Sequence, residues 1–203
     1  MSRNVYKDKY YTHFDVKKFH KDYKKRVENI VWVSKHGFYP FIHFSMKFNK
    51  YTNDSEGYKY IKTKERDIYY SAHIDRYIYE YYGNRLNNRY NAYLKKNGIN
   101  RVSTAYRNCT PGKCNIDFAK EVFEFIVNCE SAYIFVGDFS KFFDNLDHKY
   151  LKKKIKSVIN ANTLDAADYA IYKNITHFSY IEADDIEKGK NKLRRDMREM
   201  GYI

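Results

Sequence analysis

An apolar run that ends in a glycine and an acid dominates the middle of this sequence. Residues 132–136 are Ala-Tyr-Ile-Phe-Val, and Gly137 and Asp138 follow directly. Aromatic and β-branched residues bounded by a turn former are typical of a buried strand. An acid held at the end of such a strand can bind a hard divalent cation, which prefers oxygen ligands. The pattern therefore predicts a buried strand that carries Asp138 as a metal ligand.

Asp138 also opens a longer motif. Phe143 stands five residues after it, and Asp144 and Asp147 follow before a helical pattern at 149–155. This arrangement resembles the first palm motif of reverse transcriptases of the bacterial and group II intron type. The resemblance implies that Asp138 binds catalytic Mg²⁺ and that Phe143 is the steric gate that excludes the 2′-hydroxyl of a ribonucleotide. From the residues alone, an acid that caps a turn is the alternative for Asp138, and Asp147 is predicted to N-cap the next helix.

The charge balance predicts a polyanionic partner. The 203 residues contain 38 Lys and Arg against 25 Asp and Glu, a net charge of +13 with a pI near 9.4. Cations that neutralise phosphates release condensed counterions, so nucleic acid is the expected partner. A membrane is the weaker interpretation, because no apolar run approaches the roughly 20 residues that a bilayer requires. Three cysteines without CxxC spacing predict reduced thiols and a cytoplasmic location.

A β-hairpin is predicted between residues 40 and 70. Apolar residues alternate with polar ones at 40–48, as in a half-buried strand, and the run of turn formers at 49–57 precedes a returning strand at 58–70. The returning strand carries Lys62, Lys64 and Arg66.

This hairpin adds to the resemblance. Lys64-Glu-Arg66-Asp-Ile, followed by Asp75-Arg76, is similar to the fingers segment of the same polymerases, although the family's Ile-Pro after the arginine is absent. The resemblance implies that Arg66 and Lys64 hold the nucleotide triphosphate. The chemistry agrees, because a guanidinium grips phosphate oxygens bidentately and a lysine adds a mobile charge. The alternative is a set of exposed basic residues without a ligand.

Helical periodicity predicts most of the remaining elements. Apolar residues at spacings of three and four predict helices over 14–30, 73–96, 116–127, 149–159 and 164–172. The apolar face of the helix at 116–127 is predicted to pack under the strand that ends at Asp138. Asp75 and Arg76 are predicted to form a cap and an ion pair at a helix start, and Gly98 to end that helix.

Two further features have open or structural roles. Arg107 occupies the place of a Gly-Phe-Arg motif in intron-type enzymes, and contact with nucleic acid and a buried structural role are equally favoured. Asp184 and Asp185 lack the aromatic residue and flanking strands of the family's second catalytic motif. They are predicted to be first-turn acids of a last helix.

Together these features predict an α+β fold made of reverse-transcriptase fingers and a partial palm, helix-rich, with a fingers hairpin and a short palm sheet. The expected divisions are a helical extension at 1–35, fingers at 36–130 and a partial palm at 131–203, which is expected to end before the remaining metal acids. The resemblance implies Mg²⁺, dNTP, an RNA template and a DNA primer, in an intron, retron or phage-defence setting. The exposed palm edge predicts self-association or a partner chain. The alternatives are a non-catalytic nucleic-acid-binding module and a basic scaffold protein.

Overall fold

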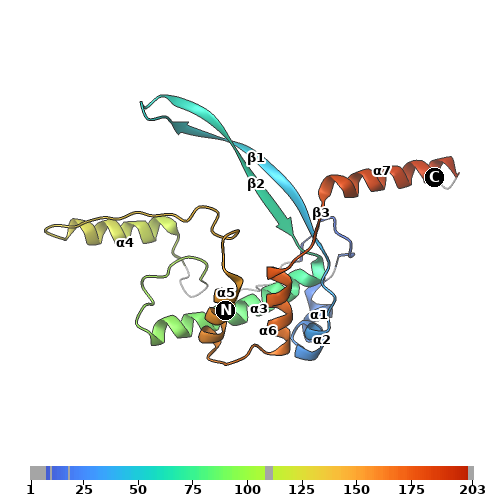
Figure 1. Ribbon diagram of the computed structural model, residues 1–203, viewed down its shortest axis with the longest axis horizontal. Helices are drawn as coiled ribbons and strands as arrows, with labels where there is room; N and C mark the ends of the chain where they lie inside the picture. Colours follow the sequence, from blue (N-terminus) through green and yellow to red (C-terminus); the bar gives the residue numbers. More distant parts are fainter. Residues whose placement is uncertain (1–7, 10, 18, 108–111, 201–203) are drawn as a thin grey trace. The chain divides into compact units, whose positions relative to one another are not determined.

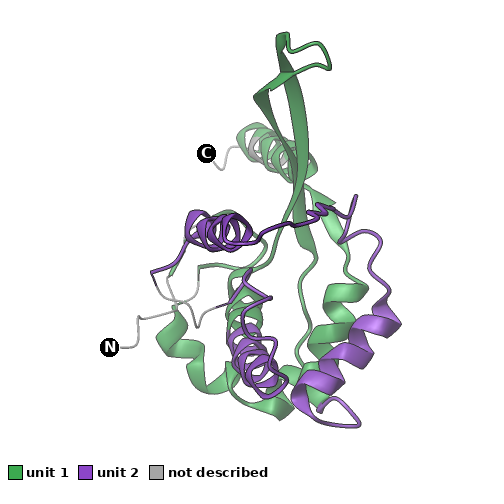
Figure 2. Cartoon of the chain, turned by 90° about the vertical axis from the view of Figure 1, so that its left-hand side faces the viewer, with its two compact units in different colours: residues 1–80, 166–203 green, residues 81–165 purple. Residues whose placement is uncertain are grey.

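The computed structural model describes residues 8–200 except residues 10, 18 and 108–111, and the side chains of residues 193 and 194. The chain forms two compact units, one made of Met1–Glu80 with Ala166–Ile203 and the other of Tyr81–Asp165 (Figure 2). We call them unit 1 and unit 2. The mixture of helices with a small sheet agrees with the predicted α+β class. Among the described residues, no helix has the length and apolar character needed to cross a membrane.

A long β-hairpin is the main feature of unit 1 (Figure 1). Strands β1 (Phe41–Asn53) and β2 (Lys59–Tyr70) pair antiparallel from Ile42 opposite Tyr70 to Asn53 opposite Lys59. The predicted hairpin is therefore confirmed. It is longer than predicted, because pairing continues through the polar residues after Phe48.

The tip of the hairpin is a turn held by Asp54. Its side chain accepts hydrogen bonds from the backbone of Glu56 at 3.0 Å and of Tyr58 at 2.8 Å. Gly57 has a φ of +89°, a conformation that glycine adopts without steric cost. The local chemistry of this turn fixes the register of both strands.

A third strand was not predicted. β3 (Tyr180–Glu182) pairs parallel to β1, giving the sheet order β2-β1-β3. Helix α7 (Ala183–Glu199) follows at once, and Asp184 and Asp185 lie in its first turn as predicted. Acids at that end of a helix are favoured by the partial positive charge of its free N–H groups.

The helices of unit 1 pack around a small core. They are α1 (His20–Val27), α2 (Ile30–Ser34), α6 (Ala166–Thr176) and the start of α3 (His73–Lys96), and α2 packs against α6. Fully buried side chains from these helices and from β1 include Val27, Val33, Ile42, Tyr77, Ile78 and Ala167.

The single helix predicted over 14–30 is wrong. None of the described residues before His20 is helical, and a second helix starts at Ile30. Asn29 interrupts the pattern because its side chain accepts the backbone N–H of Trp32 at 2.9 Å and so N-caps α2.

Unit 2 contains the rest of α3 with α4 (Asn115–Val127) and α5 (His148–Ile159). Gly98, with a φ of +70°, follows the end of α3 as predicted. Asp147 N-caps α5, also as predicted, because its side chain accepts the backbone N–H of Tyr150 at 2.8 Å.

The buried strand predicted at 132–138 is not formed. Residues 132–139 have no regular secondary structure, and Tyr133, Phe135 and Val136 are almost fully exposed. Helix α4 has no buried residues, so its predicted packing under that strand is also wrong. A strand needs a neighbour for its backbone N–H and C=O groups, and none of the described strands pairs with this segment.

Candidate functional site

One face of the hairpin combines cations with aromatic and apolar side chains. Side chains alternate between the two faces of a strand, and residues paired across the ladder share a face. The pairs Met46–Arg66, Phe48–Lys64 and Lys50–Lys62 therefore lie on the same side. We call this the cationic face, made of Phe44, Met46, Phe48, Lys50, Lys62, Lys64, Arg66 and Ile68.

The opposite face carries both carboxylates of the two strands. Glu65 pairs with Lys47 at 3.6 Å, and Asp67 accepts the hydroxyl of Ser45 at 2.8 Å. Because β1 has no acidic residue and β2 has only these two, the cationic face holds no carboxylate from either strand. The hairpin thus separates its charges by face.

The cations of this face are available to a ligand. Lys62, Lys64 and Arg66 are all exposed. The Arg66 guanidinium lies 5.2 Å from the ring centroid of Phe48 on the neighbouring strand, and this cation–π contact holds the Arg66 side chain against the face of the hairpin. A guanidinium and nearby ammonium groups without a carboxylate between them suit the oxygens of a phosphate.

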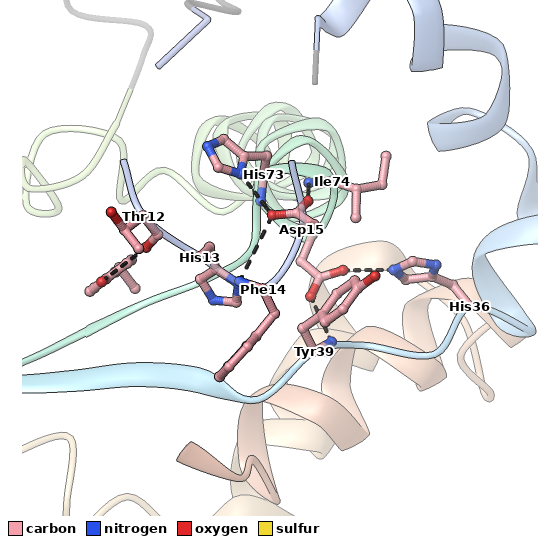
Figure 3. Close-up of polar contacts among 10 residues, drawn as sticks. Thr12, His13, Phe14, Asp15, His36, Tyr39, His73 and Ile74 are labelled. Carbon is pink, nitrogen blue, oxygen red and sulfur yellow. Dashed lines mark hydrogen bonds and ion pairs between the residues drawn. The ribbon is translucent and has the colours of Figure 1, made fainter. Parts of the chain in front are cut away.

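A buried carboxylate anchors the root of the hairpin. Asp75, in the first turn of α3, is fully buried, and its Oδ1 lies 2.6 Å from His36 Nε2. The backbone N–H of Tyr39, just before β1, donates to the Asp75 Oδ2 at 2.9 Å. Figure 3 labels His36 and Tyr39, and the dashed lines from them mark these two contacts. Asp75 therefore ties the entry of the hairpin to α3.

The cap of α3 comes from a different acid than predicted. Asp15 accepts the backbone N–H groups of His73 and Ile74, each at 3.1 Å, and lies 2.7 Å from His73 Nδ1 (Figure 3). Burial opposes ionisation of Asp15, but these hydrogen bonds outweigh it, so its pKa is lowered. The predicted capping role of Asp75 is wrong, and Arg76 pairs with Glu80 at 3.5 Å instead.

An imidazole bridges two acids where the hairpin meets β3. His43 Nδ1 lies 2.8 and 2.9 Å from the two Glu182 oxygens, and its Nε2 lies 3.2 Å from Asp67. The hydrogen bond to Glu182 raises the pKa of His43, as does that to Asp67, while desolvation lowers it. The three residues come from β1, β2 and β3, so this contact joins all strands of the sheet.

The palm-like motif lies in unit 2, on an exposed segment. Asp138 follows the extended residues 132–137, and Phe143 lies in a turn with its side chain 76% exposed and its ring 5.5 Å from that of Phe142. Among the described residues, no group of three His, Cys, Asp or Glu side chains could hold a metal ion. Mg²⁺ is usually bound by one or two carboxylates together with substrate phosphates, so Asp138 fits one ligand position and not a whole site.

Arg107 holds a loop of unit 2 together. Its Nε donates to the Asn91 side chain at 2.8 Å, and its Nη1 donates to the carbonyls of Asn100 and Ser103, both at 2.8 Å. Its Nη2 donates to the Asn100 side chain at 2.6 Å. These contacts favour the structural one of the two roles considered for Arg107.

The sequence indicated part of this arrangement. The spacing of two between Lys64 and Arg66 places them on one face of any strand, but the contribution of Phe48 and Lys50 depends on the register. His43 was missed as well, because its two partners lie 24 and 139 residues away. A scan against protein-family models and a search of curated proteins each found no match.

Proposed function

We propose that this chain is the fingers and first palm portion of a reverse-transcriptase-type polymerase, in which the hairpin holds the triphosphate of an incoming nucleotide. The observation that carries the proposal is the cationic face, with Lys64 and Arg66 side by side and both strand carboxylates on the opposite face. The motif from Asp138 to Asp147 supplies the polymerase element of the proposal.

The chemistry assigned to the whole enzyme is attack of a primer 3′-hydroxyl on the α-phosphate of a dNTP, which forms a phosphodiester bond while the bond to the β-phosphate breaks and pyrophosphate leaves. Lys64 and Arg66 bind and orient the triphosphate, and neutralise part of its charge. Phe143 excludes the 2′-hydroxyl of a ribonucleotide. Asp138 would hold Mg²⁺, which supplies charge stabilisation at the phosphate when bound, together with further oxygen ligands.

The first test compares two faces of one strand. Arg66→Ala removes a cation of the cationic face, and Lys59→Ala removes an exposed cation of the opposite face of β2. A hydrogen bond to a charged group contributes about 1.5–3 kcal/mol, so Arg66→Ala should weaken binding of a fluorescent dNTP with Mg²⁺ at least about tenfold. Lys59→Ala should change it less than about twofold. Equal effects of the two variants would refute the assignment of the triphosphate to this face.

The second test concerns the proposed steric gate. Phe143→Ala should increase use of ribonucleotides relative to deoxyribonucleotides in primer extension by the complete enzyme. Because the Phe143 side chain is 76% exposed, the same change should alter the free energy of unfolding by less than about 0.5 kcal/mol. Unchanged discrimination between the two nucleotide classes would remove the gate assignment.

A non-catalytic nucleic-acid-binding module is the second candidate. It is favoured by the fact that the cationic face needs no carboxylate to bind phosphates, whereas Asp138 meets only one ligand position. Magnesium separates the two functions. If dNTP and primer-template bind equally with and without Mg²⁺, and Asp138→Ala has no effect, the binding module is favoured over the polymerase.

A further inference from the structure

Helix α5 in unit 2 is unusually rich in one charge. Its twelve residues, His148–Ile159, include five lysines and no acid. Leu151, Ile155, Val158 and Ile159 are half-buried and recur at helical spacing, so they form an apolar side of the helix. Lys149, Lys153 and Lys156 recur at spacings of four and three and therefore share one stripe. We call this stripe, with Ser157, Asn160 and Asn162, the α5 lysine surface.

The end of α5 shapes this surface into an open hollow. Asn160 adopts a left-handed conformation with a φ of +53°, and the backbone N–H of Ala161 donates to the Lys156 carbonyl at 3.0 Å. The hollow of about 520 Å³ is lined by Lys153, Lys156, Ser157, Asn160, Ala161 and Asn162. Every polar side chain in this lining can donate a hydrogen bond, and none is a carboxylate.

The lysines of this surface differ from others in the chain. Lys47, Lys113, Lys120 and Lys188 each pair with a nearby Glu or Asp. Across the part of the chain that the structure describes, no carboxylate forms an ion pair with Lys153 or Lys156.

This arrangement is unfavourable for the helix on its own. Like charges three and four residues apart repel each other along the stripe. The helix dipole favours cations only in the last turn, and Lys149 is in the first turn. A bound polyanion would relieve this repulsion.

We propose that the α5 lysine surface binds the phosphodiester backbone of a nucleic acid, as a contact separate from the hairpin. The inference rests on the proposed function for the kind of polyanion. Lys149 and Lys156 stand about 10 Å apart along the helix axis, which corresponds to about three base-pair rises along the axis of a duplex. The lining has no aromatic ring to stack on a base, so the contact is independent of sequence. The half-buried apolar side disfavours insertion into an anionic membrane.

The test uses the whole chain and two triple variants of equal charge. K149Q/K153Q/K156Q changes the α5 lysine surface, and K47Q/K120Q/K188Q is the matched control, since each of its lysines is exposed and ion-paired. Glutamine keeps a high helix propensity, and circular dichroism checks the fold of both variants. The probe is a fluorescent 20-nucleotide single-stranded RNA of mixed sequence, titrated at 50 to 200 mM KCl.

Loss of three phosphate contacts should make the negative slope of log K for RNA binding against log salt less steep by about 2 for a single strand. It should also weaken binding at least about tenfold at 100 mM KCl. The control should change the slope by less than about 1. Equal slopes for the two triple variants would overturn the proposal in favour of net charge alone. Undiminished RNA binding, with lost binding to vesicles containing phosphatidylserine, would overturn it in favour of a membrane.

The hairpin variants separate this proposal from the polymerase assignment. If Arg66→Ala weakens dNTP binding while K149Q/K153Q/K156Q leaves the RNA salt slope unchanged, the proposed function stands and the α5 contact is refuted. If Arg66→Ala leaves dNTP binding unchanged while K149Q/K153Q/K156Q reduces the RNA salt slope, the α5 contact stands and the hairpin assignment is refuted.

Discussion

Replacement of Asp75 by alanine tests how the hairpin is held in unit 1. Asp75 is fully buried, and its two oxygens contact His36 Nε2 at 2.6 Å and the backbone N–H of Tyr39 at 2.9 Å. Asp75→Ala leaves both of these groups, which are partly buried, without their partner. Removal of one member of a buried polar pair costs about 3–5 kcal/mol.

We therefore expect Asp75→Ala to lower the free energy of unfolding by about 4 kcal/mol, roughly a thousandfold in the folding equilibrium. Asp75→Asn keeps one carbonyl oxygen as an acceptor and should lose about half as much. Glu65→Ala is the control, because Glu65 forms only an exposed pair with Lys47 and should cost less than about 1 kcal/mol.

The assay is urea unfolding of the whole chain, followed by circular dichroism. Hydrogen exchange at the backbone of Tyr39 gives a local measure, since this amide loses its acceptor in the alanine variant. A loss of less than about 1 kcal/mol for Asp75→Ala, equal to that of Glu65→Ala, would refute the anchoring role of this carboxylate.

Three further predictions concern Asp15, His43 and Arg107. Asp15→Asn should lower the free energy of unfolding at neutral pH. The pKa of Asp15 is lowered in the folded chain, so its stabilisation is present above the pKa of the unfolded chain and is lost on acidification. The difference from the wild type should therefore shrink below about pH 4, and urea unfolding at pH 7 and pH 3 measures it. The raised pKa of His43 gives stability that is present below about pH 6.5 and is lost as the pH rises through the pKa of the folded chain. Backbone amide hydrogen exchange at residues 180–182, corrected for the intrinsic rate, should therefore increase between pH 6 and 9 in the wild type. The increase should be much smaller in His43→Gln. Arg107→Ala should cost about 2 kcal/mol in urea unfolding, and Arg107→Lys should not restore it, since an ammonium cannot reproduce the guanidinium contacts with Asn91 and Asn100.

The sequence predicted the elements whose signals are local. The hairpin follows from alternation along each strand and from the turn formers between the strands. The end of α3 at Gly98, the N-cap at Asp147 and the first-turn acids of α7 follow from residues within one turn of the feature.

Elements that depend on distant partners were not predictable in the same way. The run at 132–136 has the composition of a buried strand, but its burial depends on another strand or helix to cover it. The anchoring by Asp75 replaced a local expectation through contacts 36 and 39 residues away. The break at Asn29 is different, because its cap is local and was hidden by apolar spacing that continues through it.

The candidate site also has a part that the sequence predicts locally and a part that depends on distant residues. The proximity of Lys64 and Arg66 on one face is a property of a single strand. The absence of carboxylates from that face depends on how β1 and β2 are paired. A shift by one residue would place Glu65 opposite Phe48 and Asp67 opposite Met46. The assignments of Asp138 and Phe143 stay predictions.

The length of the hairpin has a mechanical consequence. β1 has 13 residues, so the ribbon reaches about 40 Å from its root, where Asp75 holds the entry and His43 joins the strands. A tilt of about 10° at the root displaces the tip by about 7 Å. The hairpin thus acts as a lever. A force that a ligand applies to the cationic face near the tip exerts a torque on the contacts at the root, and this torque grows with the length of the hairpin.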